Sequence, residues 1–180
     1  MEQGKNEIAI LGAGCFWCIE TIFQQLNGVE SVQSGYTGGH IKNPAYKEVC
    51  NGTTGHAEVA KIVFNPKIIS FSEILEVFWK VHDPTTLNRQ GGDVGTQYRS
   101  AIFYTSETQK ELAEKYKSEL DQVGAYANPI VTEITAFDIF YPAEDYHNDY
   151  FNLHGDEQYC RLVIQPKVEK FKKVFNDKLK

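Results

Sequence analysis

The order of the apolar segments in the N-terminal part of the chain limits its fold most strongly. Residues 8–11, 29–36, 57–64 and 101–104 form short apolar or alternating runs that predict β-strands. After the first and third runs, apolar residues recur at the spacing of an amphipathic helix. The order strand–helix–strand–strand–helix–strand predicts an α+β two-layer sandwich with a ferredoxin-like β-α-β-β-α-β core.

Both predicted helices have recognisable ends. The first begins near Cys15, and Gly28 stands where a C-terminal cap is expected. Ser70 and Glu73 have the spacing of a capping box at the start of the second helix, which we expect to end before Pro84.

The C-terminal part adds further elements. They are a helix from Ser106, a strand at residues 130–134 and a last helix from Pro166. A length of 180 residues suits one domain and is enough to bury a core without disulfides. We expect a single catalytic domain at 1–180, with its core at about 7–136 and an extension at 137–180 that carries Cys160.

Composition and charge exclude several classes of function. The net charge is −6, and only the segment after Cys160 is basic, with seven Lys or Arg against two Asp or Glu. An acidic body argues against binding of nucleic acid, and the basic tail is typical of a solvated helix face. No apolar run reaches the length of a membrane helix, and the N-terminus lacks the pattern of a signal peptide. We therefore expect a cytoplasmic protein, in which cysteines serve redox, catalytic or metal chemistry rather than structural disulfides.

The strongest chemical signal is a cysteine at a predicted strand-to-helix turn. Gly-Ala-Gly at residues 12–14 precedes Cys15, so the thiol stands at the start of a helix. Backbone N–H groups and the helix dipole stabilise a thiolate there, which predicts a lowered pKa. The alternative is a buried cysteine that packs as a small apolar side chain.

Cys15 and Cys18 also form a Cys-x-x-Cys pair. That spacing fits a thioredoxin-like redox pair or half of a zinc site, but the sequence has no second such pair, which disfavours zinc. Phe16 and Trp17 between the cysteines are bulkier than a thioredoxin insert. They would form either an apolar wall beside the thiol or part of the core.

Several blocks of this sequence resemble those of one family. Gly-Cys-Phe-Trp-Cys at residues 14–18 resembles the signature of the A-type peptide methionine sulfoxide reductases. Further blocks of the same family match in the same order, at residues 34–39, 43–50, 54–58, 82–86, 93–100 and 142–147. The resemblance runs from about residue 8 to residue 166, and so covers nearly the whole chain.

The resemblance implies reduction of methionine-S-sulfoxide, free or in proteins, to methionine. Cys15 would be the nucleophile that attacks the sulfoxide sulfur. The oxygen leaves only when it is protonated, and the match assigns the proton donor to Glu48. A carboxyl group in an apolar pocket can stay protonated near neutral pH.

The same match assigns roles to five further residues. Tyr36 and Tyr98 would donate hydrogen bonds to the sulfoxide oxygen, and Asp93 would organise the loop around it. Phe16 and Trp17 would hold the S-methyl group and so discriminate between the two epimers.

The remaining cysteines would complete the cycle. Attack by Cys15 leaves a sulfenic acid, which condenses with a second thiol to a disulfide. Cys160 matches the resolving cysteine of many family members and is preferred, but Cys18 is an alternative or a second relay thiol. Cys50 is expected to be buried and without a role. The resemblance implies thioredoxin as the reductant, with no metal and no organic cofactor, and we expect a monomer.

Two other functions fit parts of the pattern. A general disulfide oxidoreductase would use Cys15 and Cys18 as its redox pair. A ferredoxin-like binding module would carry the two cysteines without using them.

Overall fold

The computed structural model describes residues 6–147 and 149–180. Its helices and strands are β1 (Glu7–Ala13), α1 (Phe16–Phe23), β2 (Val29–Thr37), α2 (Tyr46–Cys50), β3 (Ala57–Phe64), α3 (Phe71–Val81), β4 (Arg89–Gln90), β5 (Asp93–Val94), β6 (Ser100–Tyr104), α4 (Glu107–Gln122), β7 (Glu133–Ala136), β8 (Tyr141–Pro142), α5 (Tyr150–Leu153) and α6 (Gln165–Val174). Short 3-10 or π-helical turns are η1 (Thr96–Tyr98), η2 (Asp145–His147), η3 (Cys160–Ile164) and η4 (Asn176–Lys178). Within the described residues, no helix is long and apolar enough to cross a membrane.

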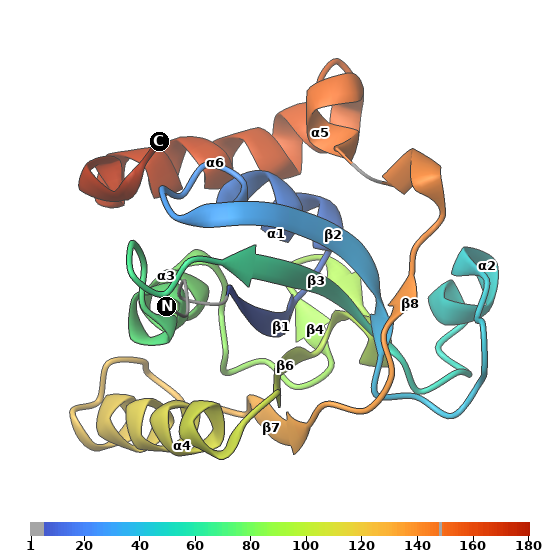
Figure 1. Cartoon of the computed structure of the whole chain (residues 1–180). Coiled ribbons are helices and arrows are strands. Elements are labelled where there is room, and N and C mark those ends of the chain that lie inside the picture. Colours follow the sequence, from blue (N-terminus) through green and yellow to red (C-terminus); the bar gives the residue numbers. More distant parts are fainter. Residues whose placement is uncertain (1–5, 148) are drawn as a thin grey trace.

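The strands form one six-stranded sheet in the order β7-β6-β1-β3-β2-β8 and a separate β4-β5 pair. The inner strands β6, β1, β3 and β2 pair antiparallel, with Leu11 opposite Ala60 and Tyr36 opposite Glu58. Strand β7 adds to β6 in parallel, and β8 adds to β2 in antiparallel orientation (Figure 1). The predicted ferredoxin-like order of elements in an α+β sandwich is confirmed.

Helices α1 and α3 pack on one face of the sheet. Side chains alternate along a strand, so Leu11 and Ile62 face the helices and meet Ile22 and Phe78. The opposite face carries a smaller apolar cluster, which contains Ile10, Val59 and Phe103 and is covered by Phe137 and Phe140. Both faces of the sheet therefore bury apolar side chains.

The sequence prediction of α1 was too long at its C-terminal end. The helix ends at Phe23 rather than near Gly28, because Leu26 pairs with Leu179 in a β-bridge and leaves the helical backbone. Gly28 has a φ of 96°, which accounts for glycine at the turn into β2. The strand predicted at residues 130–134 lies slightly later, at β7, where Ile134 pairs with Ile102.

The long polar connections contain short elements that the sequence does not signal. Helix α2 lies between β2 and β3, and the β4-β5 pair and η1 lie in the loop before β6. The segment after β7 contributes β8, η2 and α5. Elements of two to five residues are too short to show an apolar period, so their positions depend on tertiary contacts.

The C-terminal extension crosses back over the body of the molecule. Helices α5 and α6 lie on the same side of the sheet as α1 (Figure 1). Ile164, Val168 and Phe171 are buried there in the same core cluster as the residues of α1. The extension therefore packs directly on the helix that begins after Cys15.

His82 links three separate segments at the end of α3. Its ring is 8 % exposed; Nδ1 lies 2.6 Å from the carbonyl oxygen of Phe78 and Nε2 lies 2.8 Å from Oγ of Ser100. Ser100 Oγ lies 2.7 Å from Oγ1 of Thr132. Burial lowers the pKa of His82 to about 4, so the native protein holds this imidazole neutral.

We expect His82 to make the protein sensitive to acid. The unfolded chain binds a proton here below its ordinary pKa of 6.5, whereas the folded chain does so only below about 4. The free energy of unfolding should therefore fall by about 3 kcal/mol as the pH decreases from 6.5 to 4. Urea unfolding of wild type and of His82→Asn over this range measures the effect.

His82→Asn should show a weaker pH dependence, since asparagine does not titrate. His40→Asn, at an exposed histidine, is the matched control and should follow wild type. A His82→Asn variant with the pH dependence of wild type would contradict the assignment.

Candidate functional site

Cys15 lies at the turn between β1 and α1, as the sequence predicts. It is the N-cap residue of α1, and its backbone is extended with φ −62° and ψ 125°. The preceding Gly14 has a φ of 94°, and a Cβ at this position would lie 2.7 Å from the side chain of Gln90. Glycine is therefore required for the turn that presents the thiol.

The thiol of Cys15 is buried, with only 7 % of the residue exposed. Burial raises the pKa of Cys15 well above its ordinary value, although the backbone N–H of Trp17 and the hydroxyl of Tyr159 favour the thiolate. A hydrogen bond with the neighbouring Cys15 lowers the pKa of Cys18. The expected lowering of the Cys15 pKa by the helix N-terminus is therefore outweighed by burial in the free protein.

Glu58 of β3 is the buried carboxyl group of this site. It is 2 % exposed, and its Oε1 accepts a hydrogen bond of 3.2 Å from the backbone N–H of Phe16. Burial and the nearby Cys15 raise the pKa of Glu58 well above its ordinary value. Burial therefore favours the neutral form of this carboxyl group, directly beside the start of α1.

The expectation of a desolvated Glu48 is wrong. Glu48 is exposed on α2, and its carboxylate accepts a hydrogen bond of 2.9 Å from the backbone N–H of Ala45. Glu48 thus caps the first turn of α2. The sequence did carry a signal for Glu58, which is an acidic residue within the apolar run 57–64. Acidic side chains in such runs are rarely buried unless they have a partner or a function.

The structure brings Tyr36 and Tyr98 to the same region. Tyr36 is buried on β2 opposite Glu58 and donates a hydrogen bond of 3.1 Å to Oε1 of Glu144. Tyr98 is half-buried at the end of η1. Burial raises the pKa of both phenols, and the carboxylate of Glu144 adds to this effect at Tyr36, so both hydroxyl groups keep their protons.

Phe16 and Trp17 form an aromatic wall with residues from distant segments. Phe16 is buried, with its ring centroid 5.6 Å from that of Tyr36 and 6.5 Å from that of Tyr46. The indole of Trp17 donates a hydrogen bond of 3.0 Å to Nδ1 of His147. The wall expected from two sequence neighbours therefore includes rings from α2 and η2.

Glu144 and His147 hold this wall and were not singled out in the sequence. Glu144 accepts the hydroxyl of Tyr36 and, at 3.0 Å, the backbone N–H of Tyr46, which ties α2 to the sheet. Burial lowers the pKa of His147, so the ring is neutral and accepts from Trp17 at Nδ1. Both residues lie in the block 142–147, and the match of this block to the family was the sequence signal that could have pointed to them.

Asp93 contacts the C-terminal extension. Its Oδ2 accepts a hydrogen bond of 2.8 Å from the hydroxyl of Tyr159, and the same tyrosine favours the thiolate of Cys15. Tyr159 was missed by the sequence analysis, although it directly precedes Cys160. Asp93 and Cys15 are thus connected through one tyrosine.

Three of the four cysteines share one apolar cluster. Cys15, Cys18 and Cys160 belong to the same buried core, with Cys18 2 % exposed and Cys160 fully buried at the start of η3. All four cysteines are free thiols. Cys50 is exposed on α2, so the expectation that it is buried is wrong.

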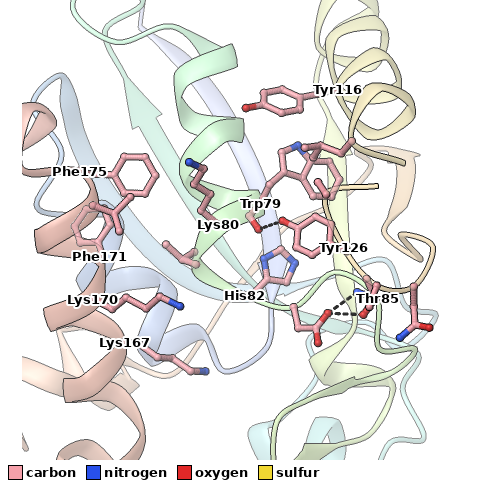
Figure 2. Close-up of a pocket in the computed structure, with 17 residues that line it drawn as sticks. Trp79, Lys80, His82, Thr85, Tyr116, Tyr126, Lys167, Lys170, Phe171 and Phe175 are labelled. Carbon is pink, nitrogen blue, oxygen red and sulfur yellow. Dashed lines mark hydrogen bonds between the residues drawn. The ribbon is translucent and has the colours of Figure 1, made fainter. Parts of the chain in front are cut away.

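The described residues hold no evident metal site, and their main groove lies away from the thiol site. Among residues 6–147 and 149–180, no group of three His, Cys, Asp or Glu side chains is arranged to hold a metal ion. A groove of about 770 Å³ lies between α3, the end of α4 and α6, with Trp79, Tyr126 and Phe171 among its lining residues (Figure 2). Neither Cys15 nor Glu58 lines this groove, so it is separate from the thiol site.

The fold and the thiol cluster place the chain among the cysteine-dependent oxidoreductases. Comparison with known families narrows this class, since the family described as "Peptide methionine sulfoxide reductase" matches residues 7–179. The chain belongs to this family.

Similar proteins come from distant organisms. The chain is 55 % identical to the "Peptide methionine sulfoxide reductase MsrA" of Saccharolobus solfataricus over 97 % of each chain. Among solved structures, reduced Mxr1 from Saccharomyces cerevisiae is 35 % identical with a TM-score of 0.81, over 88 % of this chain and 91 % of that chain. A complex of Mxr1 with Trx2 also matches, at 26 % identity and a TM-score of 0.58, over 83 % of this chain and 87 % of that chain.

Proposed function

We propose that this chain reduces methionine-S-sulfoxide, free or in proteins, to methionine, with Cys15 as the nucleophile and Glu58 as the proton donor. The observation that carries this proposal is the neutral carboxyl group of Glu58 beside the thiol of Cys15 at the start of α1. A sulfoxide oxygen is a very poor leaving group unless it receives a proton, and Glu58 has one available near neutral pH.

The first half of the reaction transfers oxygen from the substrate to Cys15. The sulfur of Cys15 attacks the sulfoxide sulfur while the carboxyl group of Glu58 protonates the oxygen. The thiol proton of Cys15 restores Glu58. The released oxygen then bonds to the sulfur of Cys15 as the new sulfur–sulfur bond breaks, which leaves a sulfenic acid on Cys15 and frees methionine. The neutral hydroxyl group of Tyr98 donates a hydrogen bond to the oxygen as charge develops on it, and that of Tyr36 does the same once it turns away from Glu144.

Phe16 and Trp17 support the choice of epimer. The apolar wall beside Cys15 favours the S-methyl group on its side, and the sulfoxide oxygen then faces the carboxyl group of Glu58, which protonates it. Asp93 assists by holding Tyr159, which favours the thiolate of Cys15.

The second half of the reaction regenerates Cys15. The thiol of Cys160 attacks the sulfenic acid, which gives a Cys15–Cys160 disulfide and water. A thioredoxin dithiol then reduces this disulfide and becomes a disulfide itself. The solved complex of the relative Mxr1 with Trx2 supports thioredoxin as the reductant. One chain supplies every group named, so we propose a monomer acting in the cytoplasm, where thioredoxin keeps thiols reduced.

Separate S and R epimers of methionine sulfoxide test the function directly. Wild type should convert the S epimer to methionine in the presence of thioredoxin and leave the R epimer unchanged. Cys15→Ser should form no methionine, since a hydroxyl is a far weaker nucleophile than a thiol. Chiral amino-acid analysis measures both; Cys50→Ser, at the exposed cysteine, is the control and should retain turnover. Methionine formation by Cys15→Ser would exclude the mechanism.

Glu58→Gln and Glu48→Gln form a matched pair for the proton donor. Glutamine retains an acceptor for the N–H of Phe16 but carries no acidic proton, so Glu58→Gln should slow methionine formation about 100-fold or more. Glu48→Gln should stay near the wild-type rate, because this residue only caps α2. Rapid-quench measurement of methionine in a single turnover gives both rates, and the reverse ranking would return the donor role to Glu48.

Cys160→Ser and Cys18→Ser decide which thiol resolves the sulfenic acid. Cys160→Ser should form one methionine per chain and then stop, even with thioredoxin present, because its sulfenic acid finds no partner. Cys18→Ser should continue to turn over. Mass spectrometry of the alkylated protein identifies the disulfide, and full turnover by Cys160→Ser would move the role to Cys18.

A further inference from the structure

Glu20 is a buried carboxyl group that the proposed reaction does not use. It lies on α1, three residues after Trp17, and is 2 % exposed. Burial raises the pKa of Glu20 to about 7, although its hydrogen bonds to Ser34 and to backbone N–H groups favour the carboxylate. A buried carboxyl group is costly unless its oxygen atoms have partners, so its contacts indicate its use.

The partners of Glu20 come from two distant segments. Oε2 accepts a hydrogen bond of 3.2 Å from the hydroxyl of Ser34 on β2. Oε1 accepts the backbone N–H of Asp149, and the backbone N–H of Tyr150 also favours the carboxylate. Glu20 therefore connects α1 and the sheet to the beginning of α5.

Helix α5 has no cap of its own. Asp149 precedes it with a φ of 58°, and its side chain accepts no hydrogen bond from the backbone of the helix. The first N–H groups of a helix need acceptors from outside it. The carboxyl group of Glu20 supplies one from another helix, and so fixes where α5 starts.

The chain after this anchor leads to the resolving thiol through three further contacts. The ring of Tyr150 stacks on Trp17 at 3.9 Å between centroids with an angle of 7°. The hydroxyl of Tyr150 donates a hydrogen bond of 2.6 Å to Glu157. The hydroxyl of Tyr159 meets Asp93, and Cys160 follows at once. The anchor at Glu20 thus stands at the beginning of the segment that places Cys160.

We infer that Glu20 is a positioning residue for the resolving step, and that it holds the start of α5 so that the extension brings Cys160 to Cys15. This inference rests on the proposed function. Disulfide formation requires the two sulfur atoms to meet in a narrow geometry, and small losses of positioning lower the rate strongly. Glu20 has no part in the transfer of oxygen to Cys15, so only the second half of the reaction depends on it.

The test separates the two halves of the reaction in the full-length protein. In Glu20→Ala, one methionine per chain should form at the wild-type rate. The Cys15–Cys160 disulfide should then form about 10-fold to 100-fold more slowly, because the segment loses its anchor. Rapid quenching with dimedone, which traps sulfenic acid, and mass spectrometry measure both steps. Glu20→Gln keeps an oxygen acceptor for the N–H of Asp149 and should restore disulfide formation to within about threefold of wild type.

Two controls make the result specific. Glu169→Ala removes an exposed carboxylate from α6 in the same extension and should change neither rate. Ser34→Ala removes the other partner of Glu20 and leaves α5 capped, so it should retain fast disulfide formation if the protein folds. Thermal unfolding of every variant confirms that the fold is intact.

Each other outcome has a defined meaning. Disulfide formation at the wild-type rate in Glu20→Ala, an equal loss in both half-reactions, or no rescue by Glu20→Gln would overturn the inference. A wild-type Cys15–Cys18 disulfide would overturn it together with the role of Cys160, while methionine formation would still support the reductase. Failure of wild type to form methionine would instead overturn the proposed function.

Discussion

Burial of two acidic groups in one small volume is the constraint on which the rest of the site depends. The thiol of Cys15 and the carboxyl group of Glu58 lie together at the start of α1, away from water. Burial raises the pKa of both groups, and the nearby Cys15 raises that of Glu58 further, because a negative charge there would have little solvent to offset it. The free site therefore keeps its protons and carries little charge.

This arrangement suits a reaction that needs a proton and a nucleophile at the same moment. A thiolate next to an ionised carboxylate would have no proton to give to the sulfoxide oxygen. With both groups protonated, Glu58 can release its proton to the oxygen and take up the one that Cys15 loses, so the net charge of the site stays unchanged. The neutral hydroxyl group of Tyr98 adds a donor without adding a cation, and Tyr36 adds a second once its hydroxyl turns away from Glu144.

Sequence reasoning predicted the strand order and the position of Cys15 at a strand-to-helix turn, because both depend on local patterns. The apolar runs predict four strands of the core, and Gly-Ala-Gly before Cys15 predicts the turn that presents the thiol. It failed where the role depends on tertiary burial. Glu48 and Glu58 lie on either side of one polar connection, and only the fold decides that the first is exposed and the second is buried in β3.

The same limit explains why the residues of the extension were missed. Tyr159 meets Cys15 and Asp93 across 144 and 66 positions of sequence, and no local periodicity reports such contacts. The pKa of Cys15 was misjudged for a related reason. The sequence shows the helix N-terminus, which favours a thiolate, but it does not show that the extension covers the thiol. Burial has the larger effect on the pKa of Cys15 and raises it.

Trp17 joins the two halves of the proposed cycle, because one side chain serves both. Its indole belongs to the aromatic wall with Phe16 and His147 and also stacks on Tyr150 of α5. The stack on Tyr150 holds the start of the segment that leads to Cys160, and the contacts with Phe16 and His147 hold the wall beside Cys15. The wall beside Cys15 and the segment that leads to Cys160 are therefore held by the same indole, so the packing of one constrains the packing of the other.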